Sequence, residues 1–245
     1  IRDRIIKNID QYKRYEDLPL SKTGCDSYPA SWPEFKRFSK EYTYDQLYQT
    51  IVNDIKTPQY KDLVITGGEP LLKGTQKKLV EFMTKYIDFI NQFETLTFET
   101  NGSQAVTDEL HDFLVNKFKK PVIFSVSPKL ACSGEPKEKT VIPVAIESYK
   151  KTVKDILANR ENDRITQVYL KFVVGDEQDV QEIESYMQSV NFTNHVDGDV
   201  YLMPVGGTVA EYNSKVKEVA ELAIKYNYRY CYRVHVAVFK NSWMC

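Results

Sequence analysis

Hydrophobic residues recur along the chain at two spacings, which predict alternating helices and short strands. Apolar residues three or four positions apart are typical of helices, and short runs rich in valine, isoleucine and phenylalanine are typical of strands. Thr43 with Gln46 forms a capping box, which predicts the start of a helix. The same pattern recurs at Thr208 with Glu211, and Asp176 precedes a further helical pattern. The expected strands are residues 63–66 (buried), 95–98, 122–126, 168–174, 200–203 and 230–238, and the expected helices are 43–55, 79–90, 110–114, 144–158, 176–187, 208–223 and a short amphipathic one within 1–12.

Strands that alternate with helices predict βαβ units and a mainly parallel sheet. Right-handed crossovers would wind this sheet into an open wound sheet or a partial barrel. We therefore expect one α/β domain over residues 1–245, with an atypical or incomplete segment at 1–24. In either architecture the functional groups lie at the carboxyl ends of the strands.

Composition narrows the class of protein. The 245 residues include 33 Lys and Arg against 34 Asp and Glu, and this balance excludes a broadly basic surface that coats nucleic acid. No apolar run approaches the ~18 residues of a membrane span. Four cysteines are too few and too scattered for a secreted disulfide scaffold, so we expect a cytoplasmic protein. The chain begins at Ile1 and its first methionine is Met83, so we expect residues upstream of Ile1 to have been lost or trimmed.

Four expected strand ends carry unusual chemistry, residues 67–70, 99–102, 127–129 and 203–204, and three of them contain polar motifs. Residues 67–70, Gly-Gly-Glu-Pro, offer exposed backbone groups and a carboxylate for an ammonium group, or else form an ordinary turn. Residues 100–102, Thr-Asn-Gly, offer a hydroxyl and an amide to a ribose or carboxylate, or form an Asx turn. Residues 127–129, Ser-Pro-Lys, offer a hydroxyl and a cation, or a solvated lysine after a turn. Their shared position at one edge of the sheet predicts a binding site.

Cys25 lies in a polar, turn-rich loop with Asp26 and Ser27. A lone cysteine is commonly a small buried apolar residue. The polar surroundings of Cys25 favour a metal or cluster ligand.

Together these motifs resemble those of the 7-carboxy-7-deazaguanine synthase family, which belongs to the radical S-adenosylmethionine superfamily. The resemblance runs from about residue 25 to 241. Gly-Gly-Glu-Pro alone indicates only the superfamily, whereas Ser-Pro-Lys and the terminal Tyr-Arg-x-His favour the narrower family. The residues that carry the resemblance to this family are 25–27, 67–70, 100–102, 127–129, 170–174, 202–204 and 232–235.

The resemblance implies a reduced (β/α) barrel and a set of site residues. It implies a 4Fe–4S cluster on Cys25, Mg²⁺ near Ser27, and S-adenosylmethionine as cofactor. Arg233 and His235 would fold over a bound pterin, and alternation along a strand would place both on one face. A surface histidine is the other interpretation of His235. The residues that would bind or line the cofactor and substrate pocket are Gly67, Gly68, Glu69, Thr100, Asn101, Ser127 and Lys129.

The implied reaction contracts 6-carboxy-5,6,7,8-tetrahydropterin to 7-carboxy-7-deazaguanine, as in queuosine-type 7-deazapurine biosynthesis. The implied partners are this small molecule, an electron donor such as flavodoxin and a second copy of the chain, with no direct contact to nucleic acid and no membrane.

The cluster motif is incomplete. The superfamily commonly uses C-x3-C-x2-C, and Cys25 matches only its last position, because Leu18 and Lys22 occupy the other two. Either cluster residues are missing from the sequence, or the protein has lost its cluster and keeps the pocket for binding or regulation. The presence of Glu69, Ser127 and Lys129 favours the first interpretation.

Overall fold

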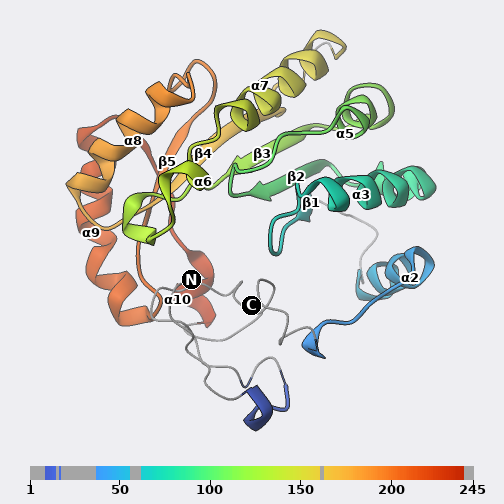
Figure 1. Ribbon diagram of the computed structural model, residues 1–245, viewed down its shortest axis with the longest axis horizontal. Coiled ribbons are helices and arrows are strands. Elements are labelled where there is room, and N and C mark those ends of the chain that lie inside the picture. Colours follow the sequence, from blue (N-terminus) through green and yellow to red (C-terminus); the bar gives the residue numbers. More distant parts are fainter. Residues whose placement is uncertain (1–8, 15–16, 18–36, 56–61, 161–162, 240–245) are drawn as a thin grey trace.

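A curved parallel sheet forms the centre of the computed structural model, which describes residues 9–14, 17, 37–55, 62–160 and 163–239. Its six strands follow one another in the order β1-β2-β3-β4-β5-β6, and every neighbouring pair is parallel. The prediction of a parallel α/β sheet wound into a partial barrel is confirmed (Figure 1). The strands are β1 (Asp62–Ile65), β2 (Thr95–Thr100), β3 (Val122–Val126), β4 (Gln167–Val174), β5 (Val200–Pro204) and β6 (Arg229–Tyr230).

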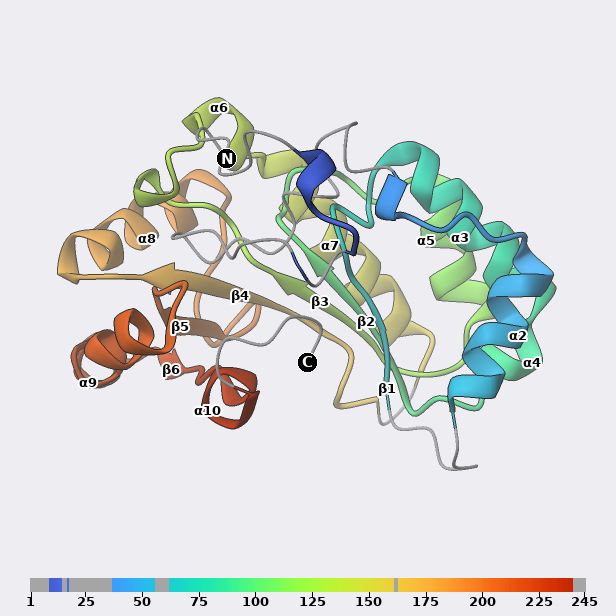
Figure 2. The ribbon, with the colours of Figure 1, turned by 90° about the horizontal axis from the view of Figure 1, so that it is seen from below.

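Helices between the strands cover the convex side of the sheet, and the concave side faces away from these helices (Figures 1 and 2). The longer helices are α2 (Tyr44–Asp54), α3 (Lys73–Lys85), α7 (Pro143–Ala158), α8 (Glu177–Ser189) and α9 (Val209–Lys225). The shorter elements are η1 (Ile9–Gln11), α4 (Ile87–Ile90), α5 (Asp108–Asp112), η4 (Phe113–Lys117, a π-helix), η5 (Ala131–Ser133), α6 (Lys137–Thr140) and α10 (Val234–Phe239).

Aromatic side chains fill the layer between the sheet and the helices. Phe98 of β2 stacks on Phe124 of β3, and Phe124 stacks on Tyr149 of α7 with ring centres 4.9 Å apart. Phe172 of β4 meets Tyr186 of α8 edge to face. Side chains alternate along a strand, so residues 99, 125, 171 and 173 face the concave side.

Three helix starts predicted from the sequence are confirmed. Thr43 and Thr208 cap α2 and α9, each in a complete capping box. The Asp176 side chain accepts hydrogen bonds from the first turn of α8. The single helix expected over 79–90 is instead two, α3 and α4, which meet at Tyr86. Tyr86 stacks on Tyr48 of α2 with ring centres 4.3 Å apart, and this packing accompanies the break.

Two expectations about strands are wrong. The first strand is at the edge of the described sheet and is not buried: Val64 is 46% exposed. The last strand ends at Tyr230, and residues 234–239 are helical instead of extended. The N–H of Cys231 still donates to the Leu202 carbonyl of β5, whereas the N–H of Arg233 donates to the Tyr212 hydroxyl, 2.6 Å away, instead of to a neighbouring strand. The alternation argument that placed Arg233 and His235 on one face therefore fails.

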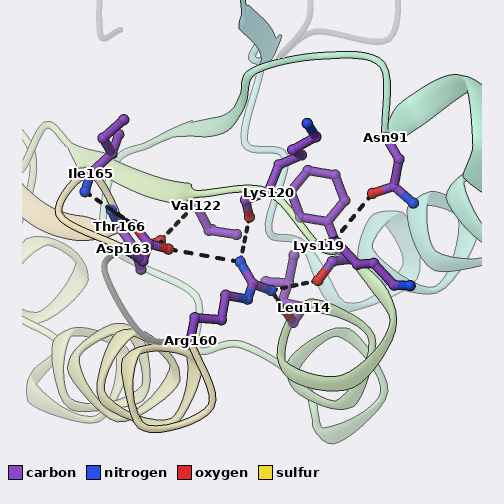
Figure 3. A network of polar contacts seen from close by, with 10 residues as sticks. Asn91, Leu114, Lys119, Lys120, Val122, Arg160, Asp163, Ile165 and Thr166 are labelled. Carbon is purple, nitrogen blue, oxygen red and sulfur yellow. Dashed lines mark hydrogen bonds and ion pairs between the residues drawn. The ribbon is translucent and has the colours of Figure 1, made fainter.

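Arg160 ties together the turns at the amino ends of β3 and β4, opposite the carboxyl ends of the strands (Figure 3). Its guanidinium donates to the backbone carbonyls of Leu114, Phe118 and Lys120. Asp163 accepts from the backbone and hydroxyl of Thr166, whose hydroxyl in turn accepts from the Val122 N–H. This network holds together the turns at the amino ends of β3 and β4, and the loops of the candidate site lie at the opposite edge of the sheet.

Candidate functional site

The carboxyl ends of β1, β2 and β3 bring the three predicted loop motifs to one edge of the sheet. These strands are adjacent and parallel, so the segments 66–70, 101–106 and 127–130 emerge side by side. The three loops are also bonded to one another. The N–H of Ser127 donates to the Thr100 carbonyl over 2.7 Å, which joins the third loop to the second.

The first loop presents open backbone. Gly67 and Gly68 have φ angles of 84° and 58°, in the region that favours glycine. A Cβ on Gly67 would contact no heavy atom within 4 Å, so the positive φ angle, and not a lack of space, favours glycine here. The space beside the backbone of Gly67 is open. This space suits the close approach of a ligand.

Glu69 joins the first loop to the second. One carboxylate oxygen accepts from the Leu71 N–H at 2.9 Å and the Thr100 hydroxyl at 2.7 Å. The other accepts from the Asn101 N–H at 2.8 Å. A carboxylate has about four acceptor positions, so these three bonds leave capacity for the ammonium group expected from the sequence. Sequence reasoning did not predict that Glu69 would join these two loops by hydrogen bonds.

The second loop uses much of its polar capacity internally. Thr100 is buried and its hydroxyl donates to Glu69. The Asn101 side-chain oxygen accepts from the Ser103 N–H at 2.9 Å, which confirms the Asx-turn interpretation of this segment. A ligand role for Thr100 and Asn101 remains a prediction, and the geometry restricts it to groups that these bonds leave available.

A buried glutamine supports the same two loops. Gln76 of α3 is 1% exposed, and its amide nitrogen donates to the carbonyls of Leu71 and Ala105. Its oxygen accepts from the Thr107 N–H at 2.8 Å. All of these polar groups are paired, so Gln76 fixes the spacing of the loops. Sequence reasoning missed Gln76, since two of its three partners lie 29 and 31 residues away.

The third loop contributes a cation at the rim. Pro128 and Leu130 are buried, whereas Lys129 between them is exposed. Among the described residues Lys129 has no ion-pair partner, so its ammonium is available at the edge where the three loops meet. Its expected role in binding the cofactor remains a prediction.

Other predicted residues lie apart from these loops or outside the described part of the chain. The Arg233 guanidinium donates to the Gly206 carbonyl at 3.0 Å, at the loop before α9. The backbone of His235 is in α10, and its side chain is not described. Cys25 and Ser27 lie outside the described residues, as do Leu18 and Lys22.

Comparison with known proteins decides the family. The 7-carboxy-7-deazaguanine synthase of Halobacterium salinarum is 32% identical to the chain over 228 residues, which cover 89% of the chain and 78% of that relative. The chain belongs to the 7-carboxy-7-deazaguanine synthase family. The synthases of Pyrobaculum aerophilum and Rhodopirellula baltica are 26% and 27% identical, over 74% and 89% of the chain and 66% and 74% of their own lengths. No family model matches the chain.

Solved structures are more distant from the chain. A structure of native anSMEcpe with bound AdoMet aligns with a TM-score of 0.44 at 14% identity, covering 94% of the chain and 66% of that protein. Streptococcus suis SuiB aligns with a TM-score of 0.41 at 12% identity, over 72% and 40%. At scores this low the likeness carries no weight, and the fold is assigned from the strand order.

Membership of a radical S-adenosylmethionine family implies an iron–sulfur cluster and S-adenosylmethionine. The open glycine loop and the remaining capacity of Glu69 fit the amino acid part of S-adenosylmethionine. The cluster does not fit the sequence, because Leu18 and Lys22 stand at two of the three ligand positions. Within the described residues no group of three or more His, Cys, Asp or Glu side chains gathers to hold a metal.

Cys132, in η5 after β3, is a free cysteine among the described residues. Burial and the nearby Asp179 carboxylate raise the pKa of the Cys132 thiol to about 12. The thiolate, which is the nucleophilic form of cysteine, is scarce at neutral pH in such a group.

We therefore expect Cys132 to react slowly with iodoacetamide at pH 8, at a rate that keeps rising above pH 9. An ordinary cysteine thiol, with a pKa of ~8.5, approaches its full rate in that range. Mass spectrometry of the Cys132 peptide measures the rate, with a short cysteine peptide in the same tube as control. A plateau at or below pH 9 would contradict the raised pKa.

A polar row on the concave face includes Glu99, Ser125 and Lys171. The sequence motifs contained Glu99 and Lys171, but sequence reasoning did not predict that they share a face with Ser125. A parallel sheet covered on both faces reads as continuous apolar runs. Strands β2 to β4 instead place polar residues at alternate positions. This alternation indicates that helices cover only one face of the sheet, and it could have been recognised in the sequence.

Proposed function

We propose that the protein is a 7-carboxy-7-deazaguanine synthase, which contracts 6-carboxy-5,6,7,8-tetrahydropterin to 7-carboxy-7-deazaguanine for queuosine-type 7-deazapurine biosynthesis. One observation carries the proposal. In a chain of this family, Glu69 bonds the glycine loop after β1 to the loop after β2, at the edge where Lys129 is exposed. The arrangement offers open backbone, a carboxylate and a cation to an amino acid cofactor.

The proposed reaction releases ammonia and is redox-neutral overall, because the product and ammonia together contain the atoms of the pterin. The bound cofactors would supply the radical chemistry. The described residues supply binding and orientation: Gly67 and Glu69 for the amino group of S-adenosylmethionine, and Lys129 for its carboxylate. Mg²⁺ near Ser27, contact of Arg233 and His235 with the pterin, an electron donor such as flavodoxin and a homodimer belong to the same proposal. None of the described helices has the length and apolar character of a membrane span.

A second candidate function is a cluster-less homologue that binds a pterin or nucleotide and acts as a regulator. The observation in its favour is that Leu18 and Lys22 occupy cluster positions. Both candidates need the same pocket, so binding alone does not separate them.

Anaerobic reconstitution of the full-length natural gene product separates the two candidates. A synthase is expected to take up about four irons and four sulfides per chain and to convert S-adenosylmethionine to 5′-deoxyadenosine under reducing conditions. Replacing Cys25 by alanine should abolish both. Substoichiometric iron with no 5′-deoxyadenosine would reject the synthase and favour the binding protein.

A further inference from the structure

Helix α7 holds the second loop of the candidate site from the helix side of the sheet. The Tyr149 hydroxyl donates to the Gln104 carbonyl at 2.5 Å. The Ser148 hydroxyl, one residue earlier on the helix, accepts from the Val106 N–H at 3.0 Å. Gln76 of α3 bonds two more backbone groups of the same segment. The end of the loop that lies farther from β2 is therefore fixed to the helix layer by side chains.

The Tyr149 side chain reaches both ends of this loop. Tyr149 is fully buried, and its ring stacks on Phe124. Burial raises the pKa of the Tyr149 phenol, the Thr100 hydroxyl beside it acts to lower this pKa, and the Glu69 carboxylate raises it further. The phenol therefore stays protonated at neutral pH and remains a donor to the Gln104 carbonyl.

Glu69 depends on the end of the loop nearer to β2. Its carboxylate accepts from the Thr100 hydroxyl and the Asn101 N–H. The Gly102 N–H donates in turn to the Thr100 hydroxyl at 3.2 Å. Gly102 has a φ angle of 78°, and a Cβ there would lie 2.9 Å from Val126 Cγ1, so the chain is closely confined at this point. A shift at the far end of the loop would therefore reach the two donors that hold Glu69.

A second buried tyrosine in the same layer offers a comparison. Tyr186 of α8 is 3% exposed, and its hydroxyl has no hydrogen-bond partner among the described residues. This hydroxyl lies 3.8 Å from the position that a Cβ on Gly102 would take, so it is also close to the second loop. The two tyrosines share burial and surroundings, but only Tyr149 is bonded to the loop.

We propose that Tyr149 is a positioning residue for the binding of S-adenosylmethionine, a role that rests on the proposed function and acts through Glu69. Its hydroxyl holds the second loop so that Thr100 and Asn101 keep their donors on Glu69. The acceptor position that these bonds leave free is thereby directed to the amino group of the cofactor. Supporting hydrogen bonds of this kind hold a binding group in place before the ligand arrives, which lowers the cost of binding.

Calorimetric titration of the full-length protein, without turnover, tests the proposal with two probes. One is S-adenosylmethionine, and the other is 5′-methylthioadenosine, which keeps the adenosine and the sulfur but lacks the amino acid part. We expect Tyr149→Phe to weaken binding of S-adenosylmethionine about fivefold, the effect of one lost hydrogen bond. Binding of 5′-methylthioadenosine should change less than about twofold, since this probe has no amino group for Glu69 to receive. A general loosening of the fold would weaken both probes alike.

A double-mutant cycle shows whether Tyr149 acts through Glu69. In a Glu69→Gln protein, Tyr149→Phe should change S-adenosylmethionine affinity by less than about twofold, because the carboxylate that it positions is gone. Ser148→Ala should weaken binding of S-adenosylmethionine about twofold to threefold with the same dependence on Glu69, and it keeps the packing of the Tyr149 ring. This second variant carries the test if Tyr149→Phe does not fold.

Tyr186→Phe is the matched control. It removes a buried tyrosine hydroxyl from the same layer without breaking a hydrogen bond among the described residues, so both affinities should stay as in the parent.

Three outcomes overturn the positioning role of Tyr149. They are unchanged S-adenosylmethionine affinity in Tyr149→Phe, an equal loss for the two probes, and an equal loss with Glu69 present or replaced. In each case binding of S-adenosylmethionine by the parent protein leaves the proposed function in place. A parent protein that does not bind S-adenosylmethionine rejects the proposed function together with the positioning role.

Discussion

Replacing Arg160 by alanine is expected to lower the free energy of unfolding by about 3–5 kcal/mol. The guanidinium is the shared donor for the carbonyls of Leu114, Phe118 and Lys120 (Figure 3). Its burial lowers the pKa of Arg160 even though the Asp163 carboxylate acts to raise it, so the charge is partly withdrawn from water. Without the side chain, three carbonyls lose their donor together and the turns before β3 and β4 lose their link.

Guanidinium chloride unfolding followed by circular dichroism measures this loss. Arg160→Lys keeps the charge, but one ammonium does not reproduce the planar fork of five donors, so a loss of about 2 kcal/mol is expected. Arg164→Ala removes an exposed arginine four positions away and should stay within about 0.5 kcal/mol of the parent. A change below about 1 kcal/mol for Arg160→Ala would show that the carbonyls are satisfied in another way.

Replacing Glu69 by glutamine should reduce both S-adenosylmethionine affinity and stability. The amide keeps one acceptor oxygen but turns an NH₂ group toward a backbone N–H or the Thr100 hydroxyl, so at least one of the bonds to Leu71, Thr100 and Asn101 is lost. A lost bond to a charged group costs about 1.5–3 kcal/mol. We expect affinity to fall tenfold or more, which corresponds to at least about 1.4 kcal/mol.

Calorimetric titration with S-adenosylmethionine, well below the melting temperature, tests the affinity. Glu138→Gln, on the exposed surface of α6, is the matched control and should bind as the parent does. A Glu69→Gln protein that is less stable but binds S-adenosylmethionine with unchanged affinity would restrict Glu69 to joining the loops.

Local signals were sufficient for the three capped helix starts and for most strands. A capping box is a hydrogen-bond exchange within four residues, so Thr43 with Gln46 specifies the start of α2 without help from distant parts of the chain. Residues 234–239 show the limit of this reasoning. Their valines favour a strand. Instead, the N–H of Arg233 donates to the hydroxyl of Tyr212, 21 residues earlier, and the following residues form a helix.

The candidate site could likewise be predicted only in part from the sequence. That the loops after β1, β2 and β3 meet at one edge follows from parallel topology, which the alternation of elements made predictable. The bonds from Glu69 to Thr100 and Asn101 join residues 31 and 32 positions apart, and no local pattern encodes them. Ser125 was overlooked because a serine between Phe124 and Val126 resembles a small residue in a buried strand.

The sequential order of the strands has a consequence for the growing chain during translation. Each strand from β2 to β6 pairs with the strand that precedes it in the sequence. When a new strand leaves the ribosome, the strand with which it will pair has therefore already been synthesised. The three loops of the candidate site follow β1, β2 and β3. All three loops of the cofactor edge are thus synthesised before β4, and every later strand is added on the side of the sheet beyond them.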